Sequence, residues 1–187
     1  MPLDAVSRLI LTLLGIGFLV ANLRILAQFC QFRRLRQSAL LTWPGRRPPF
    51  YLMLLALGAI LGALVIVKIG IQRRPPVDAF GETMMCLYYG YALPTSLRIG
   101  RGFYAGGIWA DSGFVPYATI GGLRWREGGR PTLVLIDPVR QLARTLVVPE
   151  AHYAEARRLL RDRIAAHEIQ FSGKELDLGA HDRRDDV

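Results

Sequence analysis

The sequence is poor in the residues that build metal centres and disulfide frameworks. Among its 187 residues are two cysteines, Cys30 and Cys86, and three histidines, His152, His167 and His181. One pair of cysteines excludes a disulfide framework, and the histidines are too far apart for a metal pair on a single helix. We therefore expect no metal and no cofactor, and we interpret both thiols as inert buried side chains.

Lysine is also scarce, although the chain is basic. Only two of the 24 basic residues are lysines, and 15 acidic residues leave a formal net charge of +9. A uniformly basic domain would indicate nucleic-acid binding. Here about half of the basic residues before residue 150 flank or interrupt apolar runs, which indicates lipid headgroups instead. We expect no nucleic-acid partner.

Two apolar runs occupy the first part of the chain, at residues 9–32 and 50–71. Each exceeds the roughly 20 residues that an α-helix needs to cross a bilayer. They predict a two-helix transmembrane hairpin within residues 1–72. A secretory signal peptide is the alternative for the first run, although a basic start and a small-residue cleavage site are poorly developed there.

Small residues recur at helical spacing in both runs. Gly58 and Gly62 form a GxxxG step, and Gly17 and Ala21 form a similar step in the first run. Such steps let helix backbones approach closely in lipid. They are candidate packing sites, either within the hairpin or with another subunit or a second copy.

Arginines fill the connection between the two runs, and they are candidate contacts for lipid headgroups or a partner: Arg33, Arg34, Arg36, Arg46 and Arg47. The opposite side of a two-span hairpin would carry Arg8, Lys68, Arg73 and Arg74. The positive-inside rule compares these five residues with four, a margin that does not decide the orientation.

Residues 73–96 follow as a linker or interfacial segment. Their apolar stretch MMCLYYGYALP, at residues 84–94, is too short to span a bilayer. It fits either a buried strand or a tyrosine-rich segment at the membrane interface, and the sequence leaves both open.

From residue 97 the pattern becomes that of a β domain, with turn residues between short strands as in an antiparallel meander. Within GLRWR, Leu123 and Trp125 alternate with Arg124 and Arg126, as in a strand with one solvated face. The two arginines are candidate contacts for a headgroup or an acidic partner. An amphipathic helix then extends to about residue 168, and the polar tail at 169–187 is expected to be disordered.

The stretch "VPYATIGGLRW", a hairpin, "LVVP" and a helix containing "EARRLL" resemble bacterial pleckstrin-homology-like (PH-like) domains attached to membrane helices. The resemblance covers residues 97–167. It implies a small β-barrel capped by a C-terminal helix, usually without catalysis, on the cytoplasmic side of the membrane.

Groups with catalytic potential are scattered. The segment at residues 100–105 imitates the dinucleotide fingerprint G-x-G-x-x-A, but no helical sequence follows it. Asp111, Ser112 and Asp137 occur in turns, where such residues commonly bond the backbone. We expect no catalytic site.

The predicted fold class is therefore an α+β membrane protein: a transmembrane hairpin, then a small antiparallel β domain with a C-terminal amphipathic helix. The expected function is a non-enzymatic, membrane-anchored binding or scaffold protein in the cell (inner) membrane. One alternative is an accessory subunit of a larger energy-transducing or transport complex. Another is a membrane-bound enzyme whose site uses arginines with Asp111 or Asp137.

Overall fold

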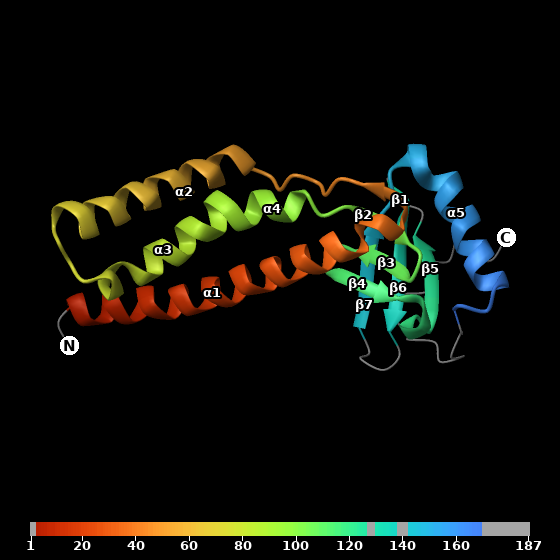
Figure 1. Cartoon of the computed structure of the whole chain (residues 1–187), viewed down its shortest axis with the longest axis horizontal. Helices are drawn as coiled ribbons and strands as arrows, with labels where there is room; N and C mark the ends of the chain where they lie inside the picture. Colours follow the sequence, from red (N-terminus) through yellow and green to blue (C-terminus); the bar gives the residue numbers. More distant parts are fainter. Residues whose placement is uncertain (1–2, 127–129, 138–141, 170–187) are drawn as a thin grey trace. The chain divides into compact units, whose positions relative to one another are not determined.

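The computed structural model describes residues 3–126, 130–137 and 142–169, and the chain divides into two compact units (Figure 1). The helical unit comprises residues 1–37 and 43–100, and the β domain comprises residues 38–42 and the described residues after 100. The expected α+β class, with two long apolar helices and small antiparallel sheets, is confirmed.

Two long helices account for the apolar runs. Helix α1 extends over Leu3–Leu35, and α2 covers Tyr51–Ile66 and continues as the π-helical turn η2 at Val67–Ile71. In the part of the chain that the structure describes, two helices, Val6–Ser38 and Tyr51–Ile71, are long and apolar enough to cross a bilayer. Leucine, isoleucine and valine dominate both, and prolines at 48, 49, 75 and 76 bound the second.

A further run of helix, which we call the third segment, occupies residues 76–97. It consists of η3 at Pro76–Ala79, α3 at Phe80–Leu87, the π-helical η4 at Tyr88–Ala92 and α4 at Leu93–Leu97. The sequence left residues 84–94 open between a strand and an interfacial segment. They are helical instead, because the segment packs against both long helices.

Glycines allow this packing. A Cβ atom on Gly81 would lie 2.4 Å from the carbonyl oxygen of Leu11 in α1, and one on Gly58 in α2 would lie 3.1 Å from the backbone nitrogen of Gly90. Helices approach this closely only where side chains are missing. The α2 glycines thus face the third segment, and α1 and α2 each pack more extensively on that segment than on each other.

The β domain contains seven strands in two sheets, followed by one helix. The first sheet has the order β1-β2-β3-β4 and the second β5-β6-β7. Their bounds are Ala39–Trp43, Arg101–Tyr104, Gly107–Ala110 and Gly113–Pro116 for the first sheet, and Gly122–Arg126, Thr132–Asp137 and Leu142–Val147 for the second. The short 3₁₀ turns η1 at Arg36–Ser38 and η5 at Tyr117–Thr119 precede β1 and β5, and helix α5 covers Glu150–Ala165.

Strand β1 was not expected, because it lies in the arginine-rich connection between the two apolar runs. It is hydrogen-bonded to β2, and the Ala105 N–H donates to the Ser38 carbonyl at 2.8 Å beside this pair. Gly102 makes the pairing possible: its φ is +131°, and a Cβ atom there would lie 2.2 Å from the Leu41 carbonyl oxygen. Gly102 thus lies within a strand, β2.

The core of the β domain is formed by side chains from both sheets and from helix α5. Phe103, Ile108, Leu133 and Leu146 are fully buried, as is Ala156 on α5. Three aromatic rings pack together in this domain: the ring centroids of Tyr104, Trp109 and Phe114 lie 5.8 to 6.2 Å apart. The Asp111 N–H donates to the Thr145 carbonyl at 3.0 Å and links the two sheets.

Candidate functional site

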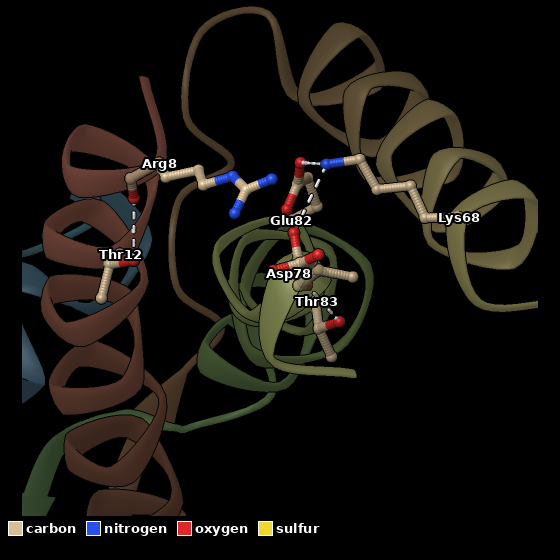
Figure 2. Close-up of polar contacts among 7 residues, drawn as sticks. Arg8, Thr12, Lys68, Asp78, Glu82 and Thr83 are labelled. Atoms are coloured by element: carbon tan, nitrogen blue, oxygen red, sulfur yellow. Dashed lines mark hydrogen bonds and ion pairs between the residues drawn. The ribbon is translucent and has the colours of Figure 1, made fainter. Parts of the chain in front are cut away.

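Three surfaces and one buried cluster hold the candidate residues. The buried cluster lies in the helical unit, where Lys68 from η2 and Glu82 from α3 form an ion pair (Figure 2). The Lys68 ammonium also donates to the Asp78 carbonyl oxygen at 3.5 Å. Lys68 is thus partly covered, with its side chain 25% exposed, and its partner Glu82 is buried, with its side chain 8% exposed.

A carboxylate this buried requires partners, because desolvation penalises an unpaired charge by several kcal/mol. Figure 2 shows the Arg8 side chain extending from α1 toward Glu82, so all three helical elements bring a charge to this end of the unit. The Thr83 hydroxyl donates to the Ala79 carbonyl at 2.7 Å. The sequence contained one usable signal: a lone lysine in an apolar run needs a carboxylate, and Glu82 follows it closely in the chain.

The five connection arginines lie at the other end of the helical unit, where α1 ends and α2 begins. All are exposed, and the Arg47 guanidinium lies over the Tyr51 ring at 5.9 Å from its centroid. The third segment runs parallel to α1, so Arg98, just after α4, reaches this same end and is exposed. This end therefore presents a dense set of cations suited to anionic headgroups.

The small residues of α1 and α2 differ in how closely other parts of the chain pack against them. Nothing lies within 4 Å of a Cβ atom placed on Gly17, whereas one on Gly62 would lie 3.2 Å from the Cys86 sulfur. Gly17 and Ala21 line an open apolar groove of about 680 Å³ between α1 and the third segment, together with Phe18, Tyr88 and Tyr89.

On the β domain, strand β5 shows the predicted alternation. Arg124 and Arg126 are exposed, while Leu123 and Trp125 are half-buried on the opposite face. The Trp125 ring meets Tyr153 of α5 edge-on, with centroids 5.1 Å apart. Helix α5 thus covers the apolar face and leaves the arginine face open to solvent.

A buried pair of tyrosines joins β2 to the turn η5. The Tyr117 hydroxyl donates to the Tyr104 carbonyl oxygen at 3.1 Å. Burial raises the pKa of Tyr104 to about 12, and burial, opposed by the Arg163 charge and reinforced by Glu168, raises the pKa of Tyr117 to about 12. The Arg163 guanidinium lies over the Tyr117 ring at 5.5 Å and forms an ion pair with Glu168.

These two phenols make the stability of the β domain dependent on pH in the alkaline range. Unfolded tyrosines release their protons near pH 10, whereas the folded ones hold theirs to about pH 12, so their stabilising contribution is complete below pH 10 and is lost as the pH rises toward 12. We expect the urea midpoint of the detergent-solubilised protein to fall over this interval. Tyr117→Phe should flatten the fall, and Tyr91→Phe, at an exposed tyrosine, should not. Identical slopes for all three proteins would contradict the assignment.

The remaining candidate groups are not brought into one site. Asp111 forms an ion pair with Arg101, the 100–105 glycine motif runs into a β-hairpin, and Asp137 lies at the end of β6 with its side chain outside the described residues. No group of three histidine, cysteine or carboxylate residues close enough to hold a metal occurs among the described residues. Cys30 is exposed on α1, contrary to the expectation that both thiols are buried, and Cys86 is half-buried.

Two residues of the C-terminal region lie just beyond helix α5. His167 has a φ of +55° and is exposed, because the helix ends at Ala165. Ile169, assigned to the tail, is buried. His181 and residues 170–187 lie outside the described part of the chain.

Comparison with known proteins identifies no relative: no family model, curated protein or solved structure matches the chain.

Proposed function

We propose that this protein is a membrane-anchored, non-enzymatic binding module, in which a helical anchor presents a small β domain at the membrane surface. The observation that carries the proposal is the apolar outer surface of the long helices. Leu13 and Val20 on α1 are each 60% exposed, and Leu52 on α2 is 79% exposed. Monomeric soluble proteins rarely expose continuous apolar surface of this extent, whereas lipid covers it at no cost.

The arrangement of the β domain supports the PH-like resemblance. Four strands and then three form two antiparallel sheets, and the C-terminal helix packs on the second through Trp125 and Tyr153. A small barrel capped by a helix is what that resemblance implies. Domains of this type act by presenting a surface, and the exposed arginines of β5 provide one here.

The arginine-rich end of the helical unit supports placement at a lipid surface. Six exposed arginines, the five of the connection and Arg98, follow or precede apolar helix at this end. Each basic residue near an anionic leaflet contributes about 1 kcal/mol of attraction. We propose that these arginines bind anionic headgroups while Arg124 and Arg126 bind an acidic partner.

Replacing Arg124 and Arg126 by serine tests the partner surface. The free energy of unfolding should change by well under 1 kcal/mol, because solvated substitutions seldom do more. The variant is purified in mild detergent, and the copurifying proteins and phospholipids are quantified. We expect it to lose the acidic partner that copurifies with the unaltered protein. The matched control replaces the exposed α5 residues Arg157 and Arg158 by serine, which removes the same charge from another face.

The assignment of Arg124 and Arg126 to a partner surface is wrong if both double variants retain, or both lose, the same copurifying proteins and phospholipids. The anchor assignment has its own test, because alkaline carbonate washing should leave the protein in the membrane pellet. Recovery in the soluble fraction would overturn the membrane proposal itself.

The open groove beside Gly17 favours a second candidate, an accessory subunit of a larger membrane complex. Unlike Gly58 and Gly62, Gly17 has no contact within this chain that requires the absence of a side chain. A helix of another subunit or a second copy fits such a groove. The same purification distinguishes this candidate, because it predicts a stoichiometric integral membrane protein that both arginine double variants retain.

A further inference from the structure

The pairing of β1 with β2 determines how many times the chain crosses the membrane. Strand β1 lies between α1 and α2 in the sequence, and β2 begins after the third segment. The two strands are hydrogen-bonded in one sheet, where neighbours lie about 4.8 Å apart, whereas about 30 Å of hydrocarbon separates the two sides of a bilayer. Both strands are therefore on the same side.

The chain between β1 and β2 must then cross an even number of times. Helix α2 is one crossing, so a second is required before residue 101. We infer that the third segment, residues 76–97, is a third membrane crossing, and that the connection between α1 and α2 shares one side with the β domain. This inference rests on the proposed membrane anchor and changes its topology from two crossings to three.

The length of the third segment agrees with this role. Its four helical elements follow one another without an intervening non-helical residue. At about 1.5 Å per residue it reaches about 30 Å, the thickness of the hydrocarbon layer. The π-helical turn Tyr88–Ala92 precedes Pro94, and such local adjustments are tolerated in membrane helices where neighbouring helices pack on them.

The contacts with α2 show that the third segment retraces it in the opposite direction. Lys68 pairs with Glu82 near one end. Farther along, Gly62 faces Cys86, and then Gly58 faces Tyr89 and Gly90. As the residue number falls along α2, it rises along the third segment, so the two helices are antiparallel and cover the same depth.

The contacts with α1 explain why this crossing is weakly apolar in sequence. Gly81 lies against the Leu11 carbonyl, and a Cβ atom on Gly15 would lie 2.7 Å from the Phe80 ring. A helix held between two others needs little lipid-facing surface. Two of its polar groups have partners nearby: one Glu82 carboxylate oxygen pairs with Lys68, and the Ser96 hydroxyl donates to the Leu93 carbonyl at 2.7 Å.

Three crossings also resolve the orientation. The exposed arginines of the connection and Arg98 now lie on the side of the β domain, whereas Arg8, Lys68, Arg73 and Arg74 belong to the other side, where Lys68 is neutralised by Glu82. The positive-inside rule counts lysine and arginine whatever their acidic neighbours, so six basic residues against four assign the β domain to the cytoplasm. The start of α1 and the turn after α2 then face the outside.

Cysteine accessibility tests the topology. Cys30 and Cys86 are replaced by alanine in the full chain, and single cysteines are introduced at exposed positions by Gln37→Cys, Gln72→Cys or Ala118→Cys. Each variant is expressed in bacterial cells, converted to spheroplasts and treated with a membrane-impermeant maleimide before and after permeabilisation. We expect Gln72→Cys to react in intact spheroplasts, and the other two to react at least tenfold more after permeabilisation. Resistance to carbonate extraction confirms that each variant is still anchored.

Each other pattern overturns either the third crossing or the orientation assigned to it. Reaction at Gln37→Cys and Ala118→Cys on opposite sides would mean two crossings, which the β1–β2 pair forbids. Reaction of all three on one side would mean that residues 51–97 do not cross. Reaction of Gln37→Cys and Ala118→Cys alone in intact spheroplasts would leave three crossings but reverse the orientation. Extraction by carbonate would instead reject the proposed anchor. This control therefore distinguishes failure of the membrane anchor from failure of the third crossing.

Discussion

Gly102→Ala is expected to destabilise the β domain by about 3 kcal/mol or more, because two penalties coincide at this residue. Its φ of +131° lies in a region that residues with a side chain rarely adopt. A Cβ atom would also lie 2.2 Å from the Leu41 carbonyl oxygen, so β1 would have to move away from β2. Urea unfolding of the solubilised protein, followed by tryptophan fluorescence, measures the loss.

Gly106→Ala is the matched control for this prediction. Gly106 lies in the turn between β2 and β3, nothing is within 4 Å of its added Cβ, and its φ is not in the left-handed region. We expect a change within about 0.5 kcal/mol, as for ordinary surface positions. If Gly102→Ala is as stable as Gly106→Ala, the Leu41 carbonyl of β1 does not lie against Gly102 of β2, and the parity argument for a third crossing loses its basis.

Gly81→Ala is expected to separate α1 from the third segment at a cost of about 2 kcal/mol, in the range found for overpacked sites. The new methyl group would lie 2.4 Å from the Leu11 carbonyl oxygen and 3.0 Å from the Leu11 carbonyl carbon. Both are backbone atoms of α1, so no side-chain rotation can relieve the overlap. Unfolding in mixed micelles, followed by circular dichroism at increasing denaturing detergent, reports the change.

Gly90→Ala gives the comparison within the same segment. A Cβ atom on Gly90 meets nothing within 4 Å, so alanine there should stabilise the helix by up to about 1 kcal/mol through helix propensity alone. Two glycines of one helical segment are thus expected to respond with opposite signs. A stabilised Gly81→Ala would show that α1 and α3 are not in contact at Gly81.

The two long helices could be predicted because each is determined locally. Residues 9–32 and 50–71 are predominantly apolar, a property that does not depend on what lies beside them. The same holds for β5, where the alternation of Arg124 and Trp125 indicates one solvent-exposed face and one face covered by protein. It also holds for α5, which begins after Pro149. In each element the signal is contained within a few adjacent residues.

The third segment could not be assigned in this way. Its tyrosines, Glu82 and Pro94 lower its hydropathy below that of α1 and α2, and Glu82 is accommodated by the Lys68 ammonium of a neighbouring helix. The small-residue step at Gly58 and Gly62 was found, but the sequence could not say which helix would lie against it. Which helix packs against which depends on the complementary shapes of segments that lie many residues apart in the sequence.

The sequence by itself therefore determined the two long apolar helices of the first part, the β character of the second and the polarity of the β5 faces. These follow from transfer free energies and local backbone preferences, which act residue by residue. Only the tertiary structure decided that five residues between the apolar helices complete a sheet with a strand some sixty positions later, and that Lys68 is neutralised by Glu82. Such pairings depend on which distant backbone atoms and charges the fold brings within bonding distance, and a local pattern alone does not determine that choice.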